Sequence, residues 1–180
     1  MAYTGFISDP SYCRNNESET ITAKWVFNND IHVSGNAKFD KLIDGTAMYA
    51  NWGDLAEKYS SDESEAIVKG TLVKFGGSSE ITKVKPNDRN FFGVVSSKPG
   101  VVLNKSNKDG IEVALIGKVP VRVIGKVKKF DKLTTSYITG VAKKKTLLDI
   151  LLLKPTVGIA LESSDNDNEK MIESFVKANM

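Results

Sequence analysis

An alternation of apolar and other residues within 112–127 limits the chain's fold more than any other feature of its sequence. The apolar positions at its centre are Val119, Val121 and Val123. A period of two in β-branched residues predicts a strand with one buried face. Gly117 and Gly125 punctuate the pattern, and Pro120 cannot donate to a strand ladder. We therefore predict two short strands bent at a corner, with Pro120 facing an edge.

Similar short apolar runs continue through the C-terminal two thirds of the chain. The runs predicted to be strands are 67–75, 81–85, 91–96, 101–103, 112–116, 119–127, 132–136, 140–143, 156–162 and 170–177. Turn formers such as Gly76-Gly77 separate them. Many short strands at this spacing predict a mainly β protein, with a compact C-terminal all-β barrel or sandwich over 67–180. Period alone leaves 144–153 open between a strand and a helical turn.

Residues 1–45 are predicted to form an extended N-terminal arm. Its first twenty residues are polar, and we expect them either to be disordered or to attach to a partner surface. The candidate attachment residues are Phe6, Ile7 and Tyr12. Residues 20–39 then predict two short strands around a turn, and an isolated hairpin is marginal in water. Their apolar side chains need burial against the C-terminal body or, more economically, against other copies of the arm. The candidate stem residues are Ile21, Trp25, Phe27, Ile31, Val33 and Phe39.

Residues 46–66 connect the arm to the body. Good helix formers around 54–58 predict one short helix near 52–59, with Asp54 as the acid of its first turn. The serine-rich and acidic segment 60–65 is typical of a polar linker.

Charge is distributed unevenly along the 180 residues. Residues 1–68 carry eleven acids and five bases, whereas 69–180 carry eleven acids and twenty bases. A candidate basic face consists of Lys126, Lys128, Lys129, Lys143, Lys144 and Lys145. It would suit an acidic partner, although a solvated lysine-rich surface is the simpler explanation. Aromatic residues are sparse there and no helix-turn-helix or zinc-finger spacing accompanies the lysines, so we expect no nucleic-acid binding.

Residue types needed for common catalytic and metal sites are scarce. Cys13 is the single cysteine, which excludes an intrachain disulfide and a cysteine-based zinc site. His32 is the single histidine and lies in the arm, where no pocket is expected. The acidic run 165–169 lacks the glycine and the distant glutamate of an EF-hand loop, so it predicts a turn. We expect no catalytic residue, cofactor or metal. No apolar run approaches the roughly 18 residues of a membrane span, so we expect no membrane insertion.

Five blocks resemble, in order and spacing, the C-terminal region of fibre, neck-appendage and related virion proteins of tailed bacteriophages. The blocks are Ala50–Tyr59, Gly70–Gly77, Phe92–Pro99, Val113–Val127 and Val157–Glu162. Residues 19–27 and 33–39 resemble the strand-and-turn shaft segments of such fibres. The resemblance implies a homotrimeric virion component, assembled in the host cytoplasm, with an intertwined shaft and a small β domain at its end.

Some relatives of this C-terminal domain are intramolecular chaperones, which template trimerisation and then cut themselves off at the domain's N-terminal edge with a serine nucleophile. The serines at that edge are Ser60, Ser61 and Ser64. The body contains no histidine to act as the base, which leaves a lysine as one available base. We expect a non-enzymatic structural protein that attaches through its arm to the tail, neck or capsid. The alternatives are a self-cleaving chaperone domain and a tip whose basic face binds a host-surface polysaccharide.

Overall fold

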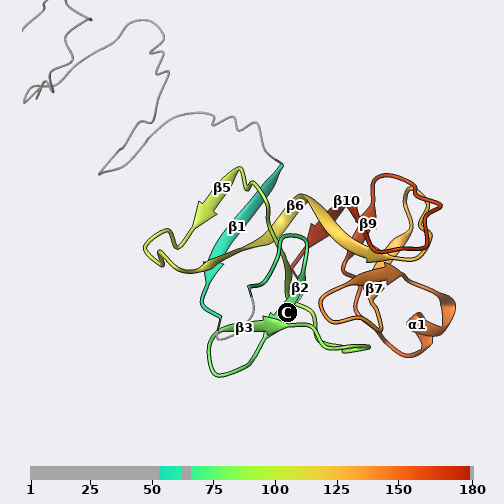
Figure 1. Cartoon of the computed structure of the whole chain (residues 1–180), viewed down its shortest axis with the longest axis horizontal. Helices are drawn as coiled ribbons and strands as arrows, with labels where there is room; N and C mark the ends of the chain where they lie inside the picture. The colour runs from blue at the N-terminus through green and yellow to red at the C-terminus, as the bar shows by residue number, and fades with distance from the viewer. Residues whose placement is uncertain (1–52, 62–65, 179–180) are drawn as a thin grey trace, which may run out of the picture. The chain divides into compact units, whose positions relative to one another are not determined.

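Strands dominate the computed structural model, which describes residues 53–61 and 66–178 (Figure 1). The strands are β1 Asp54–Tyr59, β2 Leu72–Phe75, β3 Ile81–Lys83, β4 Gly93–Val95, β5 Val101–Leu103, β6 Ile111–Ile124, β7 Lys132–Thr135, β8 Ala142–Lys144, β9 Gly158–Ala160 and β10 Lys170–Lys177, and the helix is α1 Leu147–Leu151. The mainly β prediction is confirmed. Each predicted run overlaps a strand, and the runs 112–116 and 119–127 are parts of a single strand.

The 14-residue strand β6 is shared by two rings of paired strands. In the first ring β6 pairs with β8, β8 with β7, β7 with β9, β9 with β10, and β10 returns to β6, which closes a five-stranded barrel. In the second ring β6 pairs with β1 and β4, and β2 joins β4 to β3. A bridge between Ser61 and Ile81 links the end of β1 back to β3. β5 adds to the outer side of β1 as a parallel strand.

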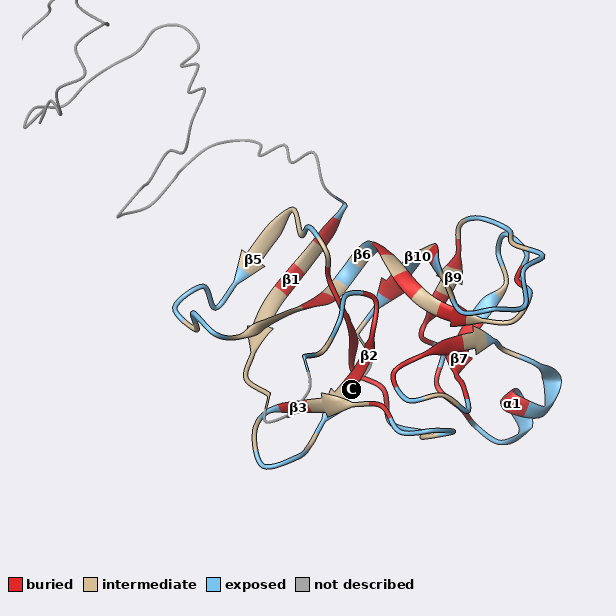
Figure 2. Ribbon diagram, in the orientation of Figure 1, coloured by how far each residue is buried: buried red, intermediate tan, exposed pale blue. Residues whose placement is uncertain are grey.

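The buried apolar residues form two clusters (Figure 2). The larger one fills the five-stranded barrel and extends into the second ring through Leu72, Val94 and Ala114. Valines from the C-terminal half of β6, including Val121 and Val123, pack inside the five-stranded barrel with Leu133 and Ile172. Val113, from the N-terminal half of β6, packs in the second core with Val73, Ile81, Phe92 and Val95. The period of two therefore describes the barrel-facing positions at 119–123, whereas the neighbours Val113 and Ala114 belong to different clusters.

A bulge and a glycine bend β6 between its two halves. The pairing of β1 with β6 shifts register between Leu55 and Ala56, which leaves one extra residue on β6 just before Gly117. Gly117 has φ of 129°, a conformation that favours glycine. Pro120 lies between Lys118 and Arg122, whose N–H groups donate to Gly53 and Gly70 on the side away from β10. N–H directions alternate along a strand, so an N–H at position 120 would point to the same side as those of Lys118 and Arg122. Pro120 lies in the gap between these two bonds, where no donor is needed.

The predicted helix at 52–59 is wrong, because Asp54–Tyr59 forms strand β1. Leu55, Ala56, Glu57 and Lys58 are good helix formers. However, the segment pairs with β6 on one side and with β5 on the other, and Asp54 and Ala56 are buried while Leu55 between them is only partly so. Tertiary pairing overrides the local propensity here. The described part of the predicted linker thus contributes a strand to the sheet.

A buried aspartate within the short helix α1 stabilises it. Thr146 caps the helix N-terminus in a capping box with Asp149. Asp149 also accepts from Lys143 Nζ at 2.7 Å and pairs with Lys154 Nζ at 3.2 Å. Burial opposes ionisation of Asp149, but the hydrogen bonds from Lys143, Thr146 and Lys154 outweigh it and hold its pKa well below the usual range. Among the described residues, no helix is long and apolar enough to span a membrane.

Replacement of Gly117 by alanine should destabilise the domain strongly. A Cβ at this position would collide with the Gly53 carbonyl oxygen and the Asp54 backbone. The matched control is Gly125→Ala, because Gly125 also has positive φ but no atom lies within 4 Å of the added Cβ. We expect the free energy of unfolding of the control to fall by roughly 1–2 kcal/mol, from backbone strain alone. The loss for Gly117→Ala should exceed it by about 2 kcal/mol in urea unfolding. Equal losses would show that the close approach is unimportant.

Asp149→Asn should lower the free energy of unfolding at pH 7 by roughly 3–5 kcal/mol, because it leaves the buried Lys154 without a counter-charge. The matched control, Asp167→Asn, removes an exposed 3.8 Å pair with Lys126 and should cost less than about 1 kcal/mol. Since the folded pKa of Asp149 lies below its unfolded value, its contribution is complete above the unfolded pKa and is lost as pH falls towards the folded one. In urea unfolding measured from pH 7 to pH 2, the free energy of unfolding should therefore decrease less in Asp149→Asn than in the unmodified chain.

Candidate functional site

A cleft of about 240 Å³ lies beside the first described residues of the domain. Its lining residues are Gly53, Asp54, Ser96, Ser97, Lys98, Lys118, Pro120 and Glu173. These residues come from the start of β1, the segment that follows β4, the middle of β6 and the middle of β10. Because β1, β4 and β10 all pair with β6, residues far apart in the sequence meet at this point.

Asp54 is the most unusual side chain in the cleft. It is only 7% exposed. Its Oδ2 is the one buried side-chain nitrogen or oxygen atom of the described residues without a hydrogen-bond partner. Burial raises the pKa of this carboxyl, and the negative charge of Glu112 on β6 adds to the rise. Hydrogen bonds from Ser96 and from the backbone N–H of Asp54 offset part of it. An unpaired buried carboxyl costs stability, and such groups with perturbed pKa values concentrate at functional sites.

The peptide bond between Gly53 and Asp54 is held tightly beside this carboxyl. The Gly53 carbonyl accepts from the Lys118 N–H at 2.9 Å, and the Asp54 carbonyl accepts from the Gly100 N–H at 2.8 Å. The aliphatic part of the Lys118 side chain lies against Gly53, since a Cβ on Gly53 would be 3.2 Å from Lys118 Cβ and 3.5 Å from Lys118 Cε. A fixed N–H aimed at a carbonyl oxygen also stabilises the negative charge that develops there when the carbonyl is attacked.

Ser96 places a hydroxyl in the same cleft. Its side chain is 5% exposed and hydrogen-bonds Asp54, while its N–H donates to the Glu112 carbonyl at 2.8 Å. A serine next to a carboxyl that can take up a proton has the elements of an activated nucleophile. The cleft therefore combines a hydroxyl, a carboxyl of raised pKa and an oriented peptide carbonyl.

The serines predicted as nucleophiles lie elsewhere. Ser60 is at the end of β1, where its hydroxyl accepts from Asn107 Nδ2 at 3.0 Å and its N–H donates to Glu80 Oε2 at 2.6 Å. Ser61 forms the bridge to Ile81, and Ser64 lies outside the described residues. Ser60 and Ser61 are thus engaged in joining β1 to β3.

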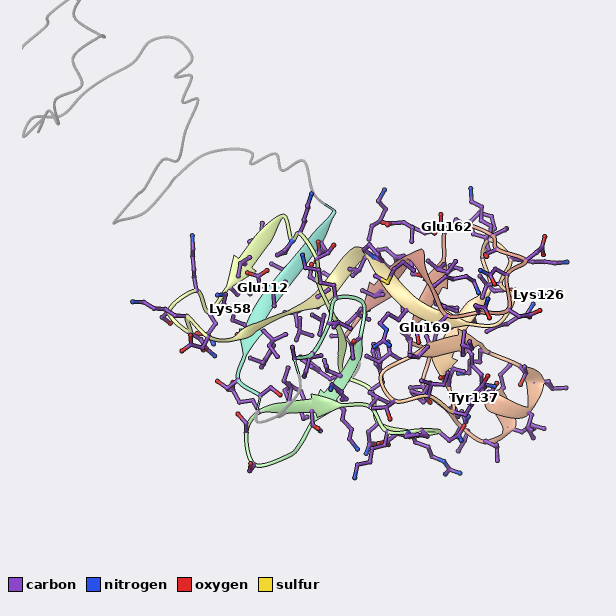
Figure 3. The ribbon with its side chains drawn as sticks, viewed as in Figure 1. Lys58, Glu112, Lys126, Tyr137, Glu162 and Glu169 are labelled. Carbon is purple, nitrogen blue, oxygen red and sulfur yellow. The ribbon has the colours of Figure 1, made fainter. Side chains whose placement is uncertain are left out.

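The predicted basic face is only partly available to a ligand. Lys143 pairs with Asp149, Lys144 pairs with Asp131 at 2.9 Å, and Lys145 donates to the Lys154 carbonyl at 2.6 Å. The remaining three lysines of the predicted face are Lys126, Lys128 and Lys129, all exposed. A shallow hollow of about 220 Å³ is lined by three of the six lysines. Figure 3 labels two of its lining residues, Lys126 and Tyr137. The hollow is lined by Ile124, Gly125, Lys126, Tyr137, Lys143, Lys144 and Thr146.

The predicted arm and stem residues lie outside the part of the chain that the structure describes. They are Phe6, Ile7, Tyr12, Ile21, Trp25, Phe27, Ile31, Val33 and Phe39, together with His32. Their roles remain predictions.

Sequence reasoning missed the residues that form the cleft. Asp54 was assigned to a helix, where it would be a solvated first-turn acid, and Ser96 and Lys118 carried no local signal. The available hint was the family resemblance, because Gly53, Asp54, Ser96 and Lys118 lie within three of its five blocks. The other residues are brought together by strand pairing, which no short sequence pattern specifies.

Comparisons with known proteins agree with this fold. A family model described as Peptidase G2, IMC autoproteolytic cleavage domain, matches residues 6–111. The pre-mature gene product 12 of bacteriophage phi29 is similar in structure, with a TM-score of 0.55 and 18% identity over 74% of this chain and 23% of that chain. The C-terminal fragment of phi29 gene product 12 gives a TM-score of 0.51 and 18% identity over 69% of this chain and 100% of the fragment. No curated protein sequence matches.

The phi29 likeness concerns the fold, and the matched part amounts to less than a quarter of the pre-mature phi29 protein. The family match covers more than half of the chain and includes Gly53, Asp54 and Ser96. The relationship to the autoproteolytic domain family, predicted from the five sequence blocks, is confirmed. The chain belongs to the Peptidase G2 family, the IMC autoproteolytic cleavage domain.

Proposed function

We propose that this chain is a structural component of a tailed-bacteriophage particle, a short trimeric fibre or appendage that is assembled with the described β domain at its end. Its family membership and its fold likeness to phi29 gene product 12 support this assignment. In this proposal the N-terminal arm attaches to other virion proteins through Phe6, Ile7 and Tyr12. The predicted stem within residues 20–45 forms the three-chain shaft, because its apolar residues need burial among copies.

We further propose that the domain cuts its own chain at the Gly53–Asp54 peptide bond. The observation that carries this proposal is the buried Asp54 carboxyl, which has an unpartnered oxygen and lies beside a peptide carbonyl already bound by the Lys118 N–H. The family description supports self-cleavage. With this proposal, the expectation of a non-enzymatic protein applies only to reactions on other molecules.

The proposed reaction uses groups of the cleft alone, together with water. The Ser96 oxygen adds to the Gly53 carbonyl carbon while the Asp54 carboxylate takes the hydroxyl proton, and the Lys118 N–H stabilises the oxyanion. The C–N bond to Asp54 then breaks, and its nitrogen receives that proton from the Asp54 carboxyl. Water hydrolyses the Gly53 ester and frees Ser96, so the products are residues 1–53 and 54–180. The raised pKa of Asp54 suits a group that must both take and give a proton.

The lysine contacts do not favour the polysaccharide-binding alternative. Lys143 and Lys144 are paired with Asp149 and Asp131, and Lys145 is bonded to the backbone of its own chain. A polyanion would have to compete with these internal partners.

Removal of residues 1–45 should weaken or abolish the trimer. The removed segment carries the predicted stem, whose burial among copies would hold the chains together. Light scattering of the full chain and the truncated chain, both carrying Asp54→Asn so that neither is cut, over a range of concentrations measures this directly. A truncated chain that stays trimeric at the same concentrations would show that the stem is not needed. A monomeric full chain would contradict the trimer itself.

Asp54→Asn and Ser96→Ala should each leave the expressed chain intact, whereas the unmodified chain should give fragments that end at Gly53 and begin at Asp54. Asn cannot cycle a proton at neutral pH, and Ala lacks the nucleophile. Intact-mass spectrometry after timed incubation measures the cut. Ser60→Ala is the matched control and should be cut like the unmodified chain. An uncut parent chain, or cleavage that persists in Ser96→Ala, would contradict the proposal.

A further inference from the structure

The first residue of β1 is anchored by bonds that do not involve the chain before it. The Asp54 carbonyl accepts from the Gly100 N–H at 2.8 Å. Asp54 is paired with Gly117 on β6, and Leu55 is paired with residues of both β5 and β6. Because all of these partners lie within residues 100–117, they stay in place when the Gly53–Asp54 bond is broken. The chain end that the proposed cut creates would therefore remain in the cleft.

The nitrogen that the cut frees already faces the carboxyl of its own residue. In the intact chain the Asp54 N–H donates to the Asp54 carboxyl, whereas Oδ2 of that carboxyl has no partner. Scission leaves the nitrogen as a neutral amine. Hydrolysis of the Gly53 ester then yields a carboxylic acid, and its proton converts the amine into an ammonium group. One neutral N–H donor is thereby replaced by a cation with three donors, enough to bond both oxygens of the carboxylate.

The charges around the cleft favour one more cation. Asp54, Glu173, Lys98 and Lys118 line it, and Glu112 on β6 adds its negative charge to the field at Asp54. When all five are ionised, three negative charges face two positive ones. The deficit matters most at Asp54, since this carboxyl is only 7% exposed and a buried charge needs a partner. An α-ammonium at Asp54 would balance the set at its most buried member.

The cations already present in the cleft do not fill this role. Lys98 and Lys118 line the same cleft, yet neither bonds to Asp54 Oδ2. The aliphatic part of the Lys118 side chain lies against Gly53. The Asp54 nitrogen differs from both lysines because it already bonds to the carboxyl in question. It needs only a change of charge, without any movement of the chain, to become the missing partner.

We propose that the cleft is a binding site for the α-ammonium group that self-cleavage creates at Asp54. The inference rests on the proposed cut and adds the fate of its product. The new chain end forms an ion pair with the Asp54 carboxylate, and Oδ2 gains its missing partner. A protonated amine held in this way cannot act as a nucleophile to remake the peptide bond. The ion pair therefore makes the cut one-way and fixes the free end of β1 in the domain.

The first test measures how accessible the new amine is in the full chain after the cut. The cut chain is treated with a trace of an acetylating reagent, and mass spectrometry of the peptide that begins at Asp54 gives the labelling rate. We expect labelling roughly ten- to a hundredfold slower in the folded chain than in urea, the factor for breaking one hydrogen bond to a charged group. The internal control is the exposed Lys128 amine, whose rate should differ little between the two conditions.

The second test distinguishes an ion pair from mere burial of the amine. Nuclear magnetic resonance of the Asp54 carboxyl carbon in the cut chain, labelled with ¹³C-aspartate, follows the titration of the adjacent amine. An opposite charge raises the midpoint of this titration, whereas burial without a partner lowers it. We expect the midpoint in the folded chain to lie about one pH unit or more above that in urea, which corresponds to a roughly tenfold stronger hold on the proton.

Failure of the inference is distinguishable from failure of the proposed cut. A chain that stays uncut, or is cut at another bond, would overturn both. A cut at Gly53–Asp54 that leaves an amine labelled as fast as in urea would keep the cut and overturn the inference. Slow labelling with a midpoint at or below that in urea would show an end that is buried without a counter-charge, and it would overturn the inference as well.

Discussion

The pairing of β6 with strands on both of its sides is the constraint on which the rest of this domain depends. One continuous strand closes a five-stranded barrel with its C-terminal half and serves a second ring with its N-terminal half. It must bend between the two cores, and the bulge before Gly117 supplies the bend. The same bend brings the Lys118 N–H to the Gly53 carbonyl. The architecture and the candidate site therefore arise from a single distortion in one strand.

The sequence predicted the parts of the fold that follow from local periodicity. Alternating β-branched residues located β6, and turn formers separated the short strands correctly. The helix expected at 52–59 failed because its propensity is local, whereas the pairing of Asp54–Tyr59 with two neighbours is not. The cleft could not be predicted for the same reason, since Asp54 and Ser96 are adjacent only through the order of strands around β6. The open choice at 144–153 ended as α1, where a capping box formed by Thr146 and Asp149 starts the helix.

Two aspartates in this domain show how environment sets the behaviour of a carboxyl. Asp149 is buried with two lysines and a threonine, so the ionised form is favoured and the group serves stability. Asp54 is buried with a serine and near Glu112, so the ionised form is disfavoured and one oxygen stays unpartnered. Both pay a desolvation cost. That cost is offset locally at Asp149, whereas at Asp54 it leaves a carboxyl of raised pKa with one unpartnered oxygen.

The bond from the Lys118 N–H to the Gly53 carbonyl links the proposed scission to the completeness of the fold. The donor is in place only when β6 has bent and β1 has paired with it. A chain that has misregistered its strands would present the same peptide bond without a polarising donor or a buried carboxyl beside it. The cut would thus act as a quality check, in which correctly built molecules are processed and defective ones keep their full length.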